Sequence, residues 1–194
     1  MFEQFLMYWL LWLLFIIIFF FMEKSKKRTM LTIWLLFIIT FSSTYMNIHI
    51  AQVSLSMIII IFGAFIYLSE APFSFLPLFK AFTIMIFYCG LLLWQVVAPV
   101  WFFLSGYFMI PVLVVFLLIL LSRRLQNVYA YTLLGISFGQ LLFDVLLHKY
   151  LFQEKIGTTA FFIQITLVIL LVIAIRSYYA LSIIISRFMT KSTL

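Results

Sequence analysis

The 41 residues from Thr29 to Ser69 contain no aspartate, glutamate, lysine or arginine and read TMLTIWLLFIITFSSTYMNIHIAQVSLSMIIIIFGAFIYLS. A helix needs about 20 mostly apolar residues to cross the hydrocarbon core of a bilayer. This stretch is therefore long enough for two crossings, which we predict at residues 29–45 and 51–69. We expect the turn between them at Tyr45 to His49.

The rest of the chain repeats this pattern. Ala81 to Ser122 is a second uncharged stretch, and Pro99 with Ser105-Gly106 predicts a break near its middle, because proline and glycine interrupt helices or mark their ends. The resulting spans are residues 81–98 and 106–122. Three further apolar stretches predict spans at residues 4–22, 127–148 and 156–176, and the partly apolar tail after Arg176 is a candidate extension of the last one.

Composition independently indicates a membrane protein. Hydrophobic residues make up 68% of the 194 residues and charged residues only 9%, which is more apolar surface than a soluble domain could bury. We therefore predict an all-α fold, a polytopic transmembrane helical bundle of about seven spans in the lipid bilayer, with residues 1–194 as a single integral membrane domain. The first span does not resemble a cleaved signal peptide, because Glu3 precedes it and its basic cluster follows it.

The basic residues predict an orientation, since lysine and arginine collect in short cytoplasmic loops. With the N-terminus outside and the C-terminus inside, ten of the twelve basic residues lie on the inner side, and only Lys149 and Lys155 lie outside. This arrangement explains the net charge of +7, so we expect no nucleic acid as a partner. The single Cys89 allows no intrachain disulfide and no cysteine-based metal cage.

Polar residues recur on one face of the sixth predicted span. Gln140, Asp144 and His148 are spaced by four residues in GQLLFDVLLHK, Gly139 to Lys149, and so share a helix face. A carboxylate that faces lipid is costly, so this face is expected to meet protein or water. The predicted threading brings further polar residues to the same outer half of the membrane, including Asn47, His49 and Gln52. The resulting candidate polar cluster consists of Gln95, Gln140, Asp144, His148 and Gln164.

The opposite face of the same span carries small residues. Gly135 and Gly139 form a GxxxG pattern, in which the missing side chains let a second helix approach closely. We therefore predict that these two glycines mark a helix-packing surface.

Three interpretations of the polar cluster stay open. In the favoured one, Asp144 pairs with His148, Lys149 or a glutamine and holds helices together. In the second, the cluster is a small polar cavity that binds or passes a solute or a proton, with Asp144 titrating and His148 relaying. In the third, His49, Asp144 and His148 form a membrane-embedded enzyme or zinc site. Their spacing matches no metalloprotease motif, so we expect no metal, no cofactor and no catalytic residue.

Four short motifs occur along the chain: Tyr8-Trp9-Leu10-Leu11-Trp12, the stretch from Phe19 to Lys24, Pro99-Val100-Trp101, and the stretch from Glu154 to Phe161. Together they resemble the YphA family of small membrane proteins from Bacillus-like bacteria, over nearly the whole chain. The resemblance implies a location in the bacterial plasma membrane. It brings no assigned biochemical activity and no catalytic residues.

These observations predict a multi-pass integral membrane protein of the bacterial plasma membrane that is not an enzyme. A structural or accessory function is the favoured prediction, with another membrane protein as a candidate partner. The alternative is a small solute or proton transporter that uses the outer-leaflet polar cluster around Asp144.

Overall fold

Seven α-helices make up most of the computed structural model, which describes residues 2–48, 51–69, 75–101, 106–121, 128–151 and 155–191. A π-helical segment, Ile17–Phe21, continues the first helix, and a 3-10 turn, Pro99–Trp101, follows the fourth. The helices are α1 Phe2–Ile16, α2 Lys26–Phe41, α3 Leu55–Ser69, α4 Phe75–Val97, α5 Gly106–Leu121, α6 Val128–Leu151 and α7 Thr159–Lys191. The predicted all-α bundle is confirmed.

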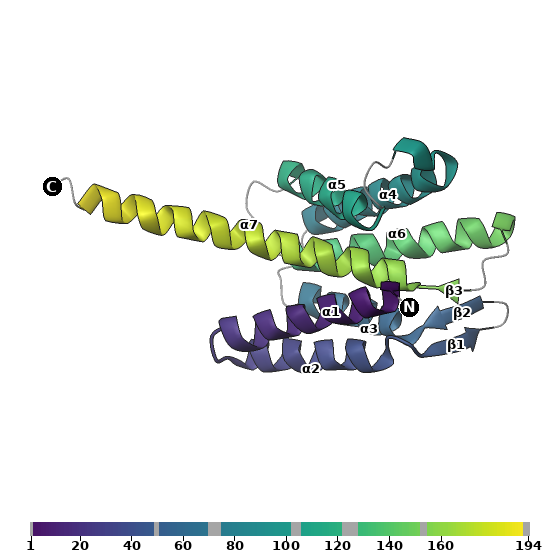
Figure 1. The fold of residues 1–194 in the computed structure, drawn as a ribbon, viewed down its shortest axis with the longest axis horizontal. Helices are drawn as coiled ribbons and strands as arrows, with labels where there is room; N and C mark the ends of the chain where they lie inside the picture. Colours follow the sequence, from purple (N-terminus) through teal and green to yellow (C-terminus); the bar gives the residue numbers. More distant parts are fainter. Residues whose placement is uncertain are drawn as a thin grey trace.

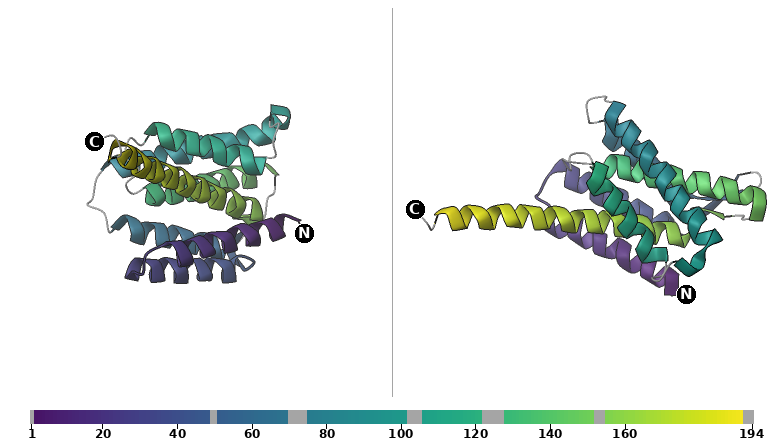
Figure 2. Two further views of the ribbon diagram at one scale, coloured as in Figure 1. Left: turned by 60° about the vertical axis from the view of Figure 1, so that its left-hand side comes forward. Right: turned by 90° about the horizontal axis from the view of Figure 1, so that it is seen from above.

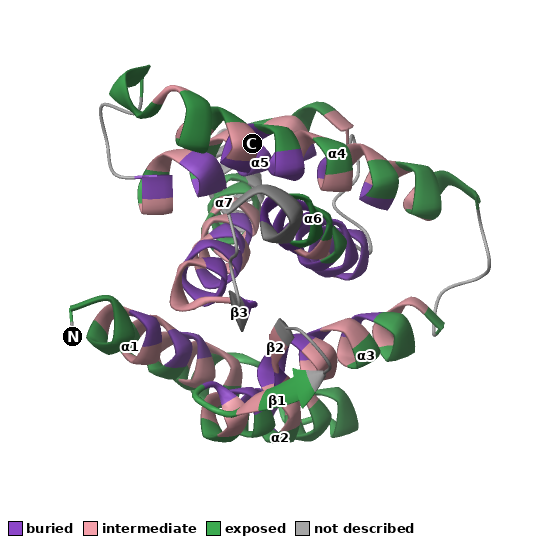
Figure 3. Cartoon of the chain, turned by 90° about the vertical axis from the view of Figure 1, so that its right-hand side faces the viewer, coloured by how far each residue is buried: buried purple, intermediate pink, exposed green. Residues whose placement is uncertain are grey.

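The helices form three layers, with α6 and α7 in the middle (Figures 1 and 2). Helices α4 and α5 cover one side of this pair, while α1, α2 and α3 cover the other (Figure 3). Helix α6 packs mainly on α4 and α3, and α7 packs mainly on α5 and α1. In the most apolar 18-residue stretch of α6, 72% of the residues are buried. In the corresponding stretch of α1 with its π-helical extension, 17% of the residues are buried. Helix α6 is therefore the centre of the core, and most of α1 faces outward.

Four helical segments are long and apolar enough to cross a bilayer by length and composition: Phe2–Phe21, Phe75–Val97, Val128–Leu147 and Thr159–Tyr179. Helices α3 and α5 are also apolar but shorter, with 15 and 16 residues. Helix α2 has 16 residues and begins with Lys26, Lys27 and Arg28. The charges of these three residues favour a position of the beginning of α2 at the membrane surface. The chain is thus an integral membrane protein with multiple membrane-spanning helices.

A small sheet lies at one end of the bundle, where the sequence predicted only a turn. Strands β1, Tyr45–Ile48, and β2, Ala51–Ser54, form an antiparallel hairpin in which Asn47 pairs with Gln52. Strand β3, Lys155–Ile156, pairs with β2 in parallel. The predicted spans 29–45, 51–69 and 156–176 therefore include residues that are strands. Strand pairing satisfies backbone N–H and C=O groups where the helices end, and hydropathy alone does not reveal it.

Two helices extend beyond their predicted spans. Helix α4 begins at Phe75, six residues before the span predicted at 81–98, and carries Lys80, whose amine lies 5.5 Å from the centre of the Tyr131 ring on α6. Pro77 is tolerated because it occupies the first turn of α4, where backbone N–H groups have no partner within the helix. Helix α7 continues past Arg176 to Lys191 and projects from the bundle (Figures 1 and 2).

Candidate functional site

Asp144 is the centre of a buried polar network at the sheet end of the bundle. Its side chain is 1% exposed, and each carboxylate oxygen accepts a hydrogen bond from one donor among the described residues. The Gln140 side-chain amide donates to Oδ1 at 2.8 Å, because residues four apart lie on the same face of a helix. The backbone N–H of Gly157 donates to Oδ2 at 3.1 Å. Two different parts of the chain therefore hold the carboxylate.

Gly157 can donate this bond because of its backbone conformation. Its φ of +76° lies in the left-handed region, which glycine adopts without the steric cost that a Cβ atom brings. This residue turns the chain between β3 and α7. A Cβ atom on Gly157 would also lie 3.0 Å from the sulfur of Met57 and 3.2 Å from the Cβ of Ser54. The turn is thus packed tightly between the sheet and α3.

Tyr88 of α4 connects the two glutamines of the network. Its hydroxyl lies 2.5 Å from Oε1 of Gln164 on α7 and 3.1 Å from Oε1 of Gln140 on α6. A phenol carries one proton, so the hydroxyl donates to one of these oxygens at a time. The Tyr88, Gln140 and Gln164 side chains are between 0% and 4% exposed. One hydroxyl therefore joins α4, α6 and α7 inside the core.

The network extends to the beginning of α5 through Gly106. The side-chain amide of Gln164 donates to the Gly106 carbonyl at 3.4 Å. A Cβ atom on Gly106 would overlap the amide of Gln95, so glycine is needed for this side chain to lie across the helix start. Among the described side chains, Gln95 reaches the network by this contact and not by a direct hydrogen bond. We call Tyr88, Gln140, Asp144, Gln164 and the Gly157 N–H the Asp144 network.

The structure brings together three of the five residues predicted for the polar cluster, namely Gln140, Asp144 and Gln164. His148 lies in α6, but its side chain is outside the described residues, as is all of His49. Asn47 is exposed on β1 and Gln52 is half-buried on β2, where the two residues pair with each other in the hairpin.

Tyr88 was not predicted as a member of the polar cluster, although the sequence carries a signal for it. Tyr88 and Gln95 are separated by seven residues, about two helical turns, and so share one face of α4. A tyrosine on the same face as a glutamine in an apolar helix is a candidate hydrogen-bond partner, because a buried phenol needs one.

Helix α4 also packs on the glycine face of α6. A Cβ atom on Gly135 would lie 2.8 Å from the Ala81 carbonyl oxygen and 2.8 Å from the Ile84 side chain. One on Gly139 would lie 2.8 Å from the Met85 carbonyl oxygen. The close approach of α4 thus uses the two small residues of the GxxxG pattern.

The chemistry of the described part of the site is that of hydrogen bonding. In the described ranges, no three His, Cys, Asp or Glu side chains lie close enough together to hold a metal ion. Three buried hydroxyls, those of Ser54, Thr132 and Ser137, have no hydrogen-bond partner among the described atoms. The arrangement can fix the relative positions of α4, α6 and α7 through one carboxylate and two amides.

The comparisons with known proteins agree with the resemblance seen in the sequence. The family model described as "YphA-like integral membrane protein" matches residues 3–193, which is nearly the whole chain. Neither the search of curated proteins nor the search of solved structures found a match. The chain therefore belongs to the family of YphA-like integral membrane proteins.

Proposed function

We propose that this integral membrane protein is a nonenzymatic accessory component of the bacterial plasma membrane, in which the Asp144 network serves as a fixed connection between helices. The observation that carries the proposal is the occupation of both Asp144 oxygens by protein donors in a site that is 1% exposed. A carrier needs water or solute at this depth. A packed structural element needs the partners that Asp144 already has.

We further propose that all seven helices cross the membrane with the N-terminus outside. Support comes from the basic residues at the end of the bundle opposite the sheet, where α2 begins with Lys26, Lys27 and Arg28. Lys80 lies over the Tyr131 ring, and the Arg176 guanidinium carbon lies 5.3 Å from the centre of the Tyr129 ring. The positive-inside rule assigns this end to the cytoplasm. The sheet then lies outside.

Labelling of single cysteines in whole cells tests both proposals. In a Cys89→Ser background, Ser137→Cys and Gln140→Cys place thiols on the Asp144 face of α6, and Asn47→Cys places one on the exposed hairpin. We expect a membrane-impermeant maleimide to label position 47 alone. Labelling at 137 and 140 would favour the small solute or proton transporter. Failure at position 47, with the protein present in the membrane, would overturn the orientation.

An accessory role requires a partner, and the projecting part of α7 offers a surface for one. Tyr178, Tyr179 and Leu181 are 71%, 55% and 58% exposed on a helix that has left the bundle. A photoreactive amino acid at Tyr178 should crosslink to a defined membrane protein at a fixed stoichiometry. The matched control is Phe116 on α5, which is 60% exposed and expected to face lipid. Crosslinks to lipid alone at both positions would contradict the accessory role.

A further inference from the structure

A large apolar cavity lies between α1, α2, α3, α6 and α7, away from the Asp144 network. Its volume is about 750 Å³, within the range of about 300–1,000 Å³ that is typical of small-molecule sites. Leu14 from α1, Leu35 from α2, Ile60 from α3 and Ile165 from α7 contribute to its wall. A chain of hydrocarbon is the kind of group that such a wall favours.

The polar part of the cavity is cationic. Lys27 and Arg176 line it where α2 begins and where α7 leaves the bundle, and no acidic side chain is among its described lining residues. The stacking of Arg176 on the Tyr129 ring holds the guanidinium at this position. The cavity thus combines an apolar interior with two positive charges at one end, which is complementary to an anionic amphiphile.

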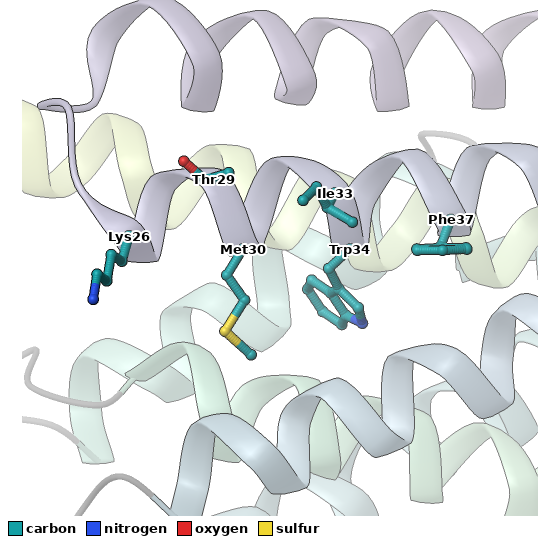
Figure 4. Close-up of a pocket in the computed structure, with 6 residues that line it drawn as sticks. All are labelled: Lys26, Thr29, Met30, Ile33, Trp34 and Phe37. Carbon is teal, nitrogen blue, oxygen red and sulfur yellow. The ribbon is translucent and has the colours of Figure 1, made fainter.

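A groove on α2 adjoins the cavity and shares two lining side chains with it. This shallower groove of about 530 Å³ follows the outside of α2 and is lined by Lys26, Thr29, Met30, Ile33, Trp34 and Phe37 (Figure 4). Met30 and Trp34 line both the groove and the cavity, so these two side chains separate them. The Trp34 indole N–H donates to the Ile59 carbonyl at 3.0 Å, and a Cβ atom on Gly63 would overlap the indole.

We propose that this cavity binds an anionic phospholipid, with an acyl chain in the apolar interior and the phosphate-bearing headgroup at Lys27 and Arg176. The lipid enters laterally past Met30 and Trp34. Positive charge at the groove, from Lys26, and in the cavity, from Lys27, lies along this route. The proposal concerns a different region from the Asp144 network, so it stands or fails independently of the accessory role.

Native mass spectrometry of the full-length protein, purified in mild detergent, tests the headgroup assignment. Phosphatidylglycerol and phosphatidylcholine with identical chains are added separately, and we expect the wild type to retain phosphatidylglycerol preferentially. Each basic residue near an anionic headgroup contributes about fivefold in affinity, so Lys27→Gln with Arg176→Gln should weaken phosphatidylglycerol binding about 25-fold. The matched control, Lys24→Gln with Lys80→Gln, removes the same charge from residues outside the cavity lining and should retain binding.

Three outcomes would overturn the headgroup assignment. These are equal retention of the two lipids by the wild type, equal weakening by the control pair, and no retained lipid. The first would mean that the two charges do not select the lipid. The second would mean that net charge, and not these two positions, attracts it.

A photoreactive phosphatidylglycerol with a diazirine in the middle of one chain tests where the chain lies. In membranes we expect crosslinks to the cavity-lining segments of α3 and α7, including Ile60 and Ile165. Ile169→Trp, at a half-buried residue of the cavity lining, fills part of the cavity and should suppress these crosslinks while crosslinks at the exposed Phe116 continue. An unchanged thermal transition of the variant excludes misfolding. Crosslinks confined to lipid-exposed residues in the wild type would overturn the proposal.

Discussion

The two ends of the bundle differ in how closely the central helices pack on their neighbours. At the sheet end, Asp144, Gln140, Gln164 and Tyr88 are almost completely buried, and their hydrogen bonds tie the central helices together. At the other end, the same central helices separate from α1, α2 and α3 around a cavity of about 750 Å³. We therefore expect substitutions at the sheet end to lower the free energy of unfolding more than substitutions at the cavity end.

Asp144→Ala should produce the largest loss of stability and so is the strongest test of this difference. The substitution leaves the Gln140 amide and the Gly157 N–H without acceptors, which costs about 2–4 kcal/mol when both donors are buried. Unfolding in mixed detergent micelles measures the free energy. Asp144→Asn is the matched control and should lose less, because one oxygen acceptor remains. A wild-type stability for Asp144→Ala would contradict a structural role for the network.

Gly135→Ala and Gly139→Ala test the close approach of α4 to α6. Each added methyl group meets a carbonyl oxygen of α4 at 2.8 Å, so we expect a loss of about 1–3 kcal/mol per substitution in the same unfolding measurement. Gly90→Ala in α4 is the matched control, because a Cβ atom there has no neighbour within 4 Å. Equal effects at the three positions would show that helix propensity, and not packing, determines the result.

Tyr88→Phe tests the hydroxyl that joins the two glutamines. The loss of one donor facing two carbonyl oxygens should cost about 1 kcal/mol. Tyr67→Phe gives the comparison at the cavity end, where the tyrosine is half-buried and makes no hydrogen bond to the described residues. We expect no measurable change in its unfolding free energy. A larger loss of unfolding free energy at Tyr67 than at Tyr88 would show that the cavity end, and not the sheet end, is the more sensitive to substitution.

Ile169→Phe should have the smallest effect. Ile169 of α7 is half-buried and lines the cavity, so the larger side chain enters existing space and we expect a change of less than about 1 kcal/mol in unfolding free energy. The same substitution at Ile84, which is completely buried against the glycine face of α6, should cost about 1–3 kcal/mol. Similar losses at both positions would show that the cavity collapses in the folded protein.

The sequence was most informative about the features that depend on local composition. Long apolar stretches predicted a helical membrane bundle, and the four-residue spacing of Gln140 and Asp144 predicted their common face. The family assignment from short motifs is confirmed by the match over residues 3–193.

Features that depend on distant pairing could not be predicted in the same way. Strand β3 contains two residues and pairs with β2 about 100 residues earlier in the chain, so no local pattern signals it. The hydrogen bond from the Gly157 N–H to Asp144 could not be predicted from the sequence either, because every residue except proline carries a backbone N–H that could donate it. The cavity depends on the volume left between five helices, which hydropathy does not encode.

The parallel pairing of β3 with β2 also sets an order of events during synthesis. At about 5–20 residues per second, the ribosome adds Lys155 roughly 5–20 s after it has completed the hairpin. During this interval β2 lacks its partner strand β3, and Asp144 gains its Gly157 donor only after the ribosome has passed β3. The final span therefore completes two unfinished sites at once, and a nascent chain stalled before residue 155 should remain a substrate for membrane quality control.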